Sequence, residues 1–149
     1  MRYSEVEIHI NRFSDFRSGM HVFETAREIL GYAMEELERA EKLRDVLLYR
    51  NAADKAFLAL IVAINEYIRI VKGVVPRSHS ERRRMLREIG REDLRALYSD
   101  IMKTLHEEAF YEGVYQPEEV RYAMKLVAKI IDELEREVEK YVSEQGKHS

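Results

Sequence analysis

The sequence predicts an all-α protein, an up-and-down bundle of about five helices. Apolar residues recur at spacings of three and four along most of the chain, which is the period of a helix with one buried face. The breaks in this pattern are glycines and prolines, namely Gly73, Pro76, Gly90, Gly113 and Pro117. Between them, residues 51–72 are apolar on almost every side, as expected for a helix at the centre of a bundle.

Composition indicates one folded domain and narrows the chemistry. Of 149 residues, 46% are hydrophobic and 36% charged, and the net charge of −3 gives no general attraction for nucleic acid. Cysteine is absent, which excludes disulfides and thiolate chemistry. The longest uncharged run in the middle of the chain, residues 56–65, is too short to span a bilayer, and the N-terminus has no apolar signal core. We therefore expect a cytoplasmic protein without membrane contact.

The first element of the bundle is expected to begin near Met20. Residues 1–19 are treated as an N-terminal arm. Residues 5–10 alternate like a strand, which cannot form a sheet alone and could pair with a symmetry mate, pack as an arm or begin a helix. The bundle is assigned to residues 20–143. Its first helix has a narrow stripe of alternating large and small residues: Phe23, Ala26, Leu30, Ala33, Leu37 and Ala40.

The central helix follows, with Asn51 as its predicted N-cap and Gly73 at its end. A capping box then predicts a short helix that starts after Ser78, with Glu81 at its third position, and stops at Gly90. The next helix is expected to run from Glu92 to the break at Gly113.

Pro117 opens the last helix, whose apolar residues form the most regular seam in the chain, over residues 120–141. This seam is predicted to be either a stripe of the bundle or a dimer contact. Residues 144–149 are expected to form a frayed tail.

Residues 76–95 are rich in arginine and form the first candidate site. Seven arginines lie between Arg77 and Arg95, so this stretch is locally positive in an acidic chain. Guanidinium groups suit phosphate oxygens, so an anion-binding or RNA-binding site is one interpretation. The alternative is a solvated face in which the arginines pair with their own glutamates. The candidate anion-binding residues are Lys72, Arg77, Arg83, Arg84 and Arg87.

Two histidines are the candidate catalytic residues. His79 is predicted at the first position of the short helix, where the helix N-terminus favours a neutral imidazole that can act as a base or a donor. His106 is predicted near the end of the following helix, from which it could face His79 across the bundle. Di-iron, zinc, Walker and dinucleotide motifs do not occur, so we expect no metal and no cofactor.

Three short segments resemble a known family. An A-A-D-K-A start of an apolar helix (residues 52–56), a P-R-S-H turn (76–79) and an L-H-x-x-x-F-Y-x-G segment (105–113) are similar to the archaeal PaREP branch of the HEPN (higher eukaryotes and prokaryotes nucleotide-binding) domains. The resemblance covers about residues 20–142. It implies a helical bundle that usually dimerises and is linked to RNA cleavage, or to nucleotidyltransferase or antitoxin partners.

The sequence departs from the nuclease members, which carry arginine four to six residues before histidine; that motif is not present within the bundle. A rearranged site would use His79 or His106 as base and Arg77 or Lys72 as the phosphate clamp. We therefore expect a homodimeric protein that binds RNA, a nucleotide or a partner protein through residues 76–95. A metal-independent ribonuclease and a structural dimerisation module without ligand are the alternatives.

Overall fold

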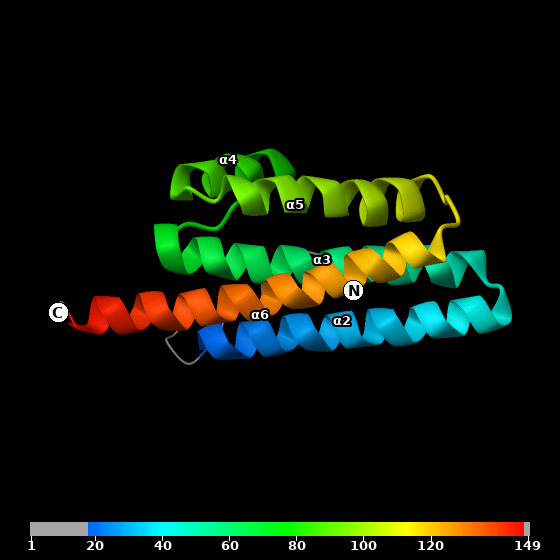
Figure 1. The fold of residues 1–149 in the computed structure, drawn as a ribbon, viewed down its shortest axis with the longest axis horizontal. Helices are drawn as coiled ribbons and strands as arrows, with labels where there is room; N and C mark the ends of the chain where they lie inside the picture. Colours follow the sequence, from blue (N-terminus) through cyan, green and yellow to red (C-terminus); the bar gives the residue numbers. More distant parts are fainter. Residues whose placement is uncertain (1–17, 148–149) are drawn as a thin grey trace.

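The computed structural model describes residues 18–147, and all of its regular structure is helical, as predicted. The elements are α2 (Ser18–Leu43), α3 (Val46–Lys72), α4 (His79–Ile89), α5 (Glu92–Met102), the π-helix η1 (Lys103–Tyr111) and α6 (Pro117–Lys147). η1 continues directly from α5, so the five α-helices form an elongated bundle (Figure 1). The arm predicted for residues 1–19 lies almost wholly outside the described residues, as do positions 148 and 149 of the predicted tail.

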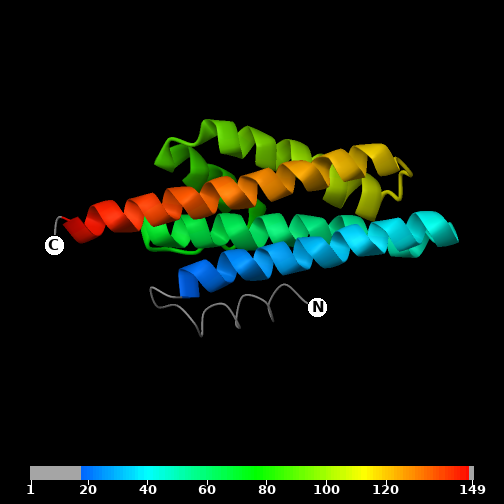
Figure 2. The same cartoon turned by 60° about the horizontal axis from the view of Figure 1, so that its bottom comes forward.

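Helix α3 is the centre of the bundle, as the sequence predicts. It contacts every other described element: α2, α4, α5, η1 and α6. Its residues from Ala56 to Ile68 are all buried, including the polar side chains of Asn65 and Glu66. Figures 1 and 2 show α2 on one side of α3 and the pair α4–α5 on the other. Because α3 has neighbours on all sides, its apolar character around the whole circumference is explained by burial.

The start of α3 differs from the prediction. Asn51 is not the N-cap, because the helix begins five residues earlier, at Val46. Asp45 is the cap: its backbone is extended and its carboxylate accepts a hydrogen bond from the amide of Leu48 at 3.0 Å. The tight turn from α2 places Arg44 at φ 53°, and the buried Tyr49 extends the packed face back toward this turn. The apolar packing therefore continues through the position where an asparagine had indicated a start.

The turn into α4 agrees with the predicted capping box. The Ser78 hydroxyl accepts a hydrogen bond from the amide of Glu81 at 3.0 Å, and the Glu81 carboxylate accepts one from the amide of Arg77 at 2.6 Å. Gly73 and Gly90 have positive φ and end α3 and α4, as predicted. These two glycines fix where α4 begins and ends, and therefore where His79 lies.

The helix predicted from Glu92 to Gly113 changes type within its length. Its second half, η1, is a π-helix, which the sequence did not indicate. A residue of α3 stabilises the end of η1: the Arg50 guanidinium donates hydrogen bonds to the carbonyl oxygens of Phe110 at 2.7 Å and Tyr111 at 3.0 Å. The π-helical turns are wider than α-helical turns, so they change the direction in which later side chains project. His106 lies in this segment.

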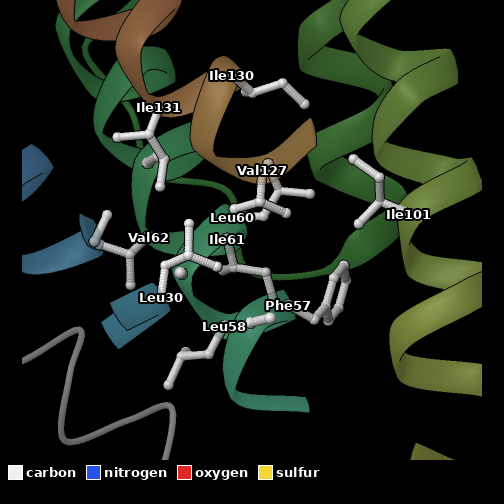
Figure 3. Packing of buried hydrophobic residues seen from close by; sticks show 14 of the residues in the cluster. Leu30, Phe57, Leu58, Leu60, Ile61, Val62, Ile101, Val127, Ile130 and Ile131 are labelled. Atoms are coloured by element: carbon white, nitrogen blue, oxygen red, sulfur yellow. The ribbon is translucent and has the colours of Figure 1, made fainter. Parts of the chain in front are cut away.

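The apolar seam of α6 is a stripe of the bundle core. Val120, Met124, Val127, Ile131, Leu134 and Val138 are all buried within the single chain. Figure 3 shows Val127 of α6 beside Leu60 of α3, and Ile130 and Ile131 belong to the same core cluster as Leu60 and Ile61. The seam is therefore already covered by α2 and α3 and is not free to form a dimer contact. The helix itself continues to Lys147, into the segment predicted as a frayed tail.

Candidate functional site

His79 is the first residue of α4, and its side chain contacts α5. Its Nδ1 atom is 2.5 Å from the hydroxyl oxygen of Tyr98 on α5 and 3.2 Å from Nη1 of Arg82, one turn further along α4. Tyr98 is fully buried and His79 is partly buried. The Ser78 cap fixes the start of the helix, so the contact of His79 with Arg82 follows from the local structure of α4, whereas the contact with Tyr98 depends on the packing of α4 against α5.

His106 projects from η1 toward α3. Its Nδ1 atom is 2.8 Å from Oδ1 of Asp54, which lies in the third turn of α3. The imidazole ring stacks with the rings of Phe57 and Phe110, with centroid distances of 5.3 Å and 5.8 Å. The His106 side chain keeps 22% of its surface exposed. One carboxylate and two aromatic rings therefore hold this histidine in a single orientation.

The two candidate histidines meet. The ring centroids of His79 and His106 are 5.9 Å apart, although 27 positions of sequence separate the residues. Phe57 of α3 contacts both rings, at 5.7 Å and 5.3 Å. We call this group the two-histidine cluster; it comprises Asp54, Phe57, Asn65, His79, Arg82, Tyr98 and His106. It draws on α3, α4, α5 and η1, and α3 provides the common wall.

Arg82 supplies a buried positive charge to the cluster. Only 4% of its surface is exposed. Its Nε donates to the side-chain oxygen of Asn65 at 2.7 Å, and its Nη1 donates to the Tyr98 hydroxyl at 3.2 Å. Among the residues that the structure describes, Arg82 forms no ion pair with a carboxylate. A buried guanidinium with neutral partners alone is costly, so the cluster favours an anion beside it.

The electrostatics of the cluster keep His79 neutral. Burial lowers the pKa of His79, and the positive charge of Arg82 lowers it further, followed by His106 and Arg83. Burial also raises the pKa of the Tyr98 hydroxyl, with Arg82 acting in the opposite direction. At neutral pH the cluster therefore holds an uncharged imidazole next to a protonated phenol.

The predicted anion-binding residues divide into two groups. Lys72 and Arg84 both pair with Glu88, the latter at 3.7 Å, and Arg87 pairs with Glu92 at 3.4 Å. In the described part of the chain, the side chains of Arg77 and Arg83 have no ion pair. Arg83 is close enough to His79 and Tyr98 to affect the pKa of both.

Comparison with known protein families identifies the family of this chain. A family model described as the archaeal PaREP1/PaREP8 family matches residues 28–131. The chain belongs to the archaeal PaREP1/PaREP8 family. No curated protein and no solved structure matches the sequence. The PaREP part of the resemblance is thus confirmed, and the wider HEPN placement stays a prediction.

Five members of the cluster in this PaREP1/PaREP8 protein were not predicted as site residues from the sequence. These residues are Asp54, Phe57, Asn65, Tyr98 and Arg82, of which Arg82 was included only as part of the arginine-rich stretch. One signal was available: Asp54 and Asn65 are eleven residues apart in an apolar helix, which places both near the same face. Polar side chains on one side of a buried helix indicate a buried polar site.

Within residues 18–147, no group of three or more His, Cys, Asp or Glu side chains is arranged to hold a metal ion. Among the described helices of the PaREP1/PaREP8 chain, none combines the length and apolarity required to cross a bilayer.

Proposed function

We propose that this PaREP1/PaREP8 protein binds RNA or a nucleotide at the two-histidine cluster, through the first turns of the 76–95 region. One observation carries the proposal: His79 and His106 converge to 5.9 Å beside Arg82, a buried cation without a carboxylate partner in the described chain. A phosphate group would balance the charge of Arg82 and accept hydrogen bonds from a neutral imidazole.

Two cations that have no ion pair within residues 18–147 support the same location. Arg77 lies just before α4, and Arg83 lies next to His79, so positive charge that no described carboxylate pairs gathers at the start of this helix. The helix N-terminus adds a partial positive charge there. Arg84 and Arg87 are paired with glutamates and contribute less to an anion site. The proposed surface is therefore smaller than the arginine-rich region as a whole.

Binding is tested with labelled single-stranded RNA and fluorescence anisotropy over a range of salt concentrations. We expect affinity that falls with salt, and a loss of roughly three- to tenfold in Arg83→Gln, because one phosphate contact to a charged group is removed. Arg39→Gln on α2 is the matched control, since Arg39 is exposed and lies outside the cluster. Equal affinity of the two variants would contradict the proposal.

A metal-independent ribonuclease is the second candidate function, and the pair Asp54–His106 favours it. A carboxylate hydrogen-bonded to a histidine orients the ring and stabilises its protonated form, as general base catalysis requires. In such a reaction His106 would take the proton of a ribose 2′-hydroxyl while that oxygen attacks the adjacent phosphorus. The 5′-oxygen would leave and take a proton from water, and the products would be a cyclic phosphate and a 5′-hydroxyl end.

Cleavage is tested by incubating labelled RNA with the protein in the presence of a chelator. His106→Gln and His79→Gln are assayed beside the wild type, and circular dichroism verifies their folds. Cleavage that disappears in His106→Gln supports the enzyme. Intact RNA with retained binding supports the binding function alone, and the absence of both supports a structural module without ligand.

We also propose a homodimer, with a nucleotidyltransferase or an antitoxin as the protein partner, on the basis of the HEPN resemblance. Because the seam of α6 is buried within one chain, the dimer face would lie on another surface. Sedimentation equilibrium of the full chain measures the oligomeric state directly.

A further inference from the structure

The hydrogen positions on the two histidines follow from the chemistry of their partners. A neutral imidazole carries one N–H donor and one nitrogen lone pair, and the group that contacts one nitrogen determines the role of the other. Both His79 and His106 are contacted at Nδ1 within the cluster. The partner of His106 at Nδ1 is an acceptor and the partners of His79 are donors, so the Nε2 atoms of the two rings have different hydrogen-bonding roles.

At His106 the partner accepts. An ionised carboxylate has no hydrogen to donate, so Oδ1 of Asp54 at 2.8 Å requires a hydrogen on Nδ1 of His106. The Nε2 atom of neutral His106 then carries the lone pair. Stacking with Phe57 and Phe110 leaves the edge of the ring as its polar contact surface. His106 therefore presents a hydrogen-bond acceptor to a ligand.

At His79 the partners donate. A guanidinium only donates, so Nη1 of Arg82 at 3.2 Å requires an unprotonated Nδ1 on His79. The same Nη1 donates to the Tyr98 oxygen, which leaves the phenol hydrogen to point at His79 Nδ1. The hydrogen of neutral His79 is therefore on Nε2. His79 presents a hydrogen-bond donor to a ligand.

We infer that the two histidines recognise a ribonucleotide by opposite hydrogen bonds: His106 Nε2 accepts from a 2′-hydroxyl, and His79 Nε2 donates to the neighbouring phosphate. The inference rests on the proposed function and names the ligand class of the same site. A ribose 2′-hydroxyl and its 3′-phosphate are a donor and an anionic acceptor on adjacent atoms, which matches a donor and an acceptor on rings 5.9 Å apart.

Asp54 and Arg82 influence the ligand through the histidines, so they are positioning residues. Asp54 fixes the hydrogen of His106, and Arg82 fixes that of His79. A deoxyribonucleotide keeps the phosphate contact and loses the hydroxyl contact. Because one hydrogen bond is removed, we expect RNA to bind roughly fivefold more tightly than DNA of the same sequence.

The hydrogen positions are measured by long-range proton–nitrogen NMR correlations on protein with labelled histidine, at a pH at which both rings are neutral. Single His→Gln variants assign the signals. We expect His106 to be protonated on Nδ1 and His79 on Nε2. In Asp54→Ala, the His106 pattern should change while the His79 pattern stays, and Arg39→Gln should change neither. The same tautomer on both rings, or no change of His106 in Asp54→Ala, would overturn the inference.

The ligand class is measured on the same samples with a short single-stranded RNA and with its 2′-deoxy counterpart, before any cleavage product accumulates. RNA should move the signals of both histidines and DNA mainly those of His79. Equal movement of His106 by both would refute the ribonucleotide class. Opposite tautomers with no response to either oligonucleotide would refute the proposed function and the ligand class together, and would leave the assigned hydrogen positions standing.

Discussion

The contact between Arg82 and Asn65 provides a quantitative test of the cluster. Nε of Arg82 donates to Oδ1 of Asn65 at 2.7 Å, and only 4% and 8% of these residues is exposed. A hydrogen bond to a charged group contributes about 1.5–3 kcal/mol, and its loss leaves a buried donor without a partner. We therefore expect Asn65→Ala to reduce the free energy of unfolding by about 2–3 kcal/mol.

A double-mutant cycle isolates this contact from general packing effects. Guanidinium unfolding followed by circular dichroism is measured for Asn65→Ala, Arg82→Met and the double variant. We expect the double variant to be about 2 kcal/mol more stable than the sum of the single effects predicts. The reason is that Arg82→Met removes the buried guanidinium, which would otherwise lose its hydrogen-bond partner in Asn65→Ala. The partly exposed pair Arg121–Glu41 is the matched control, with an expected coupling of about 0.5 kcal/mol. A coupling below about 1 kcal/mol between Arg82 and Asn65 would refute the assignment of a buried, hydrogen-bonded cation.

Three further outcomes are expected. The pKa of His79 is lower in the folded protein than in the unfolded chain, so the contribution of neutral His79 to stability is present above about pH 6.5 and is lost at lower pH. Between about pH 7.5 and 5 the free energy of unfolding should therefore fall more in the wild type than in His79→Gln, and equal losses would contradict this. Gly113→Ala should cost about 1–2 kcal/mol in thermal or chemical unfolding, because φ is 72° and the new Cβ would lie 3.3 Å from Nη1 of Arg50; an unchanged midpoint would contradict the strain. Asp45→Ala should cost about 1 kcal/mol by removing the cap of α3, whereas Asn51→Ala should have little effect if the helix begins at Val46.

The fold was predictable because its determinants are local. The Ser78–Glu81 capping box and the stop at Gly90 depend on side chains within one turn, and the sequence displays them. The start of α3 was placed at Asn51 because an asparagine can cap, but the contacts that favour a start at Val46 come from the turn after α2. Competing caps are decided by tertiary packing, which a single sequence does not show.

The candidate site was predictable in part. His79 and His106 were identified, and their approach was considered, because both carry titratable groups near helix ends. The role of Arg82 was hidden, since three consecutive arginines differ only in the direction that α4 gives them: Arg82 is buried, Arg83 partly buried and Arg84 exposed. The π-helix was equally hidden, because its wider turns are stabilised by a distant residue, Arg50.

The most direct test of the central claim is to map where RNA contacts the protein. Ultraviolet irradiation of the full chain with single-stranded RNA joins bases to nearby side chains, and mass spectrometry identifies the peptides. We expect cross-links at the aromatic residues beside His106, namely Phe110 and the exposed Tyr111, and at the start of α4. Cross-links confined to α2 or to the exposed face of α6 would contradict the claim that the two-histidine cluster is the RNA-binding site.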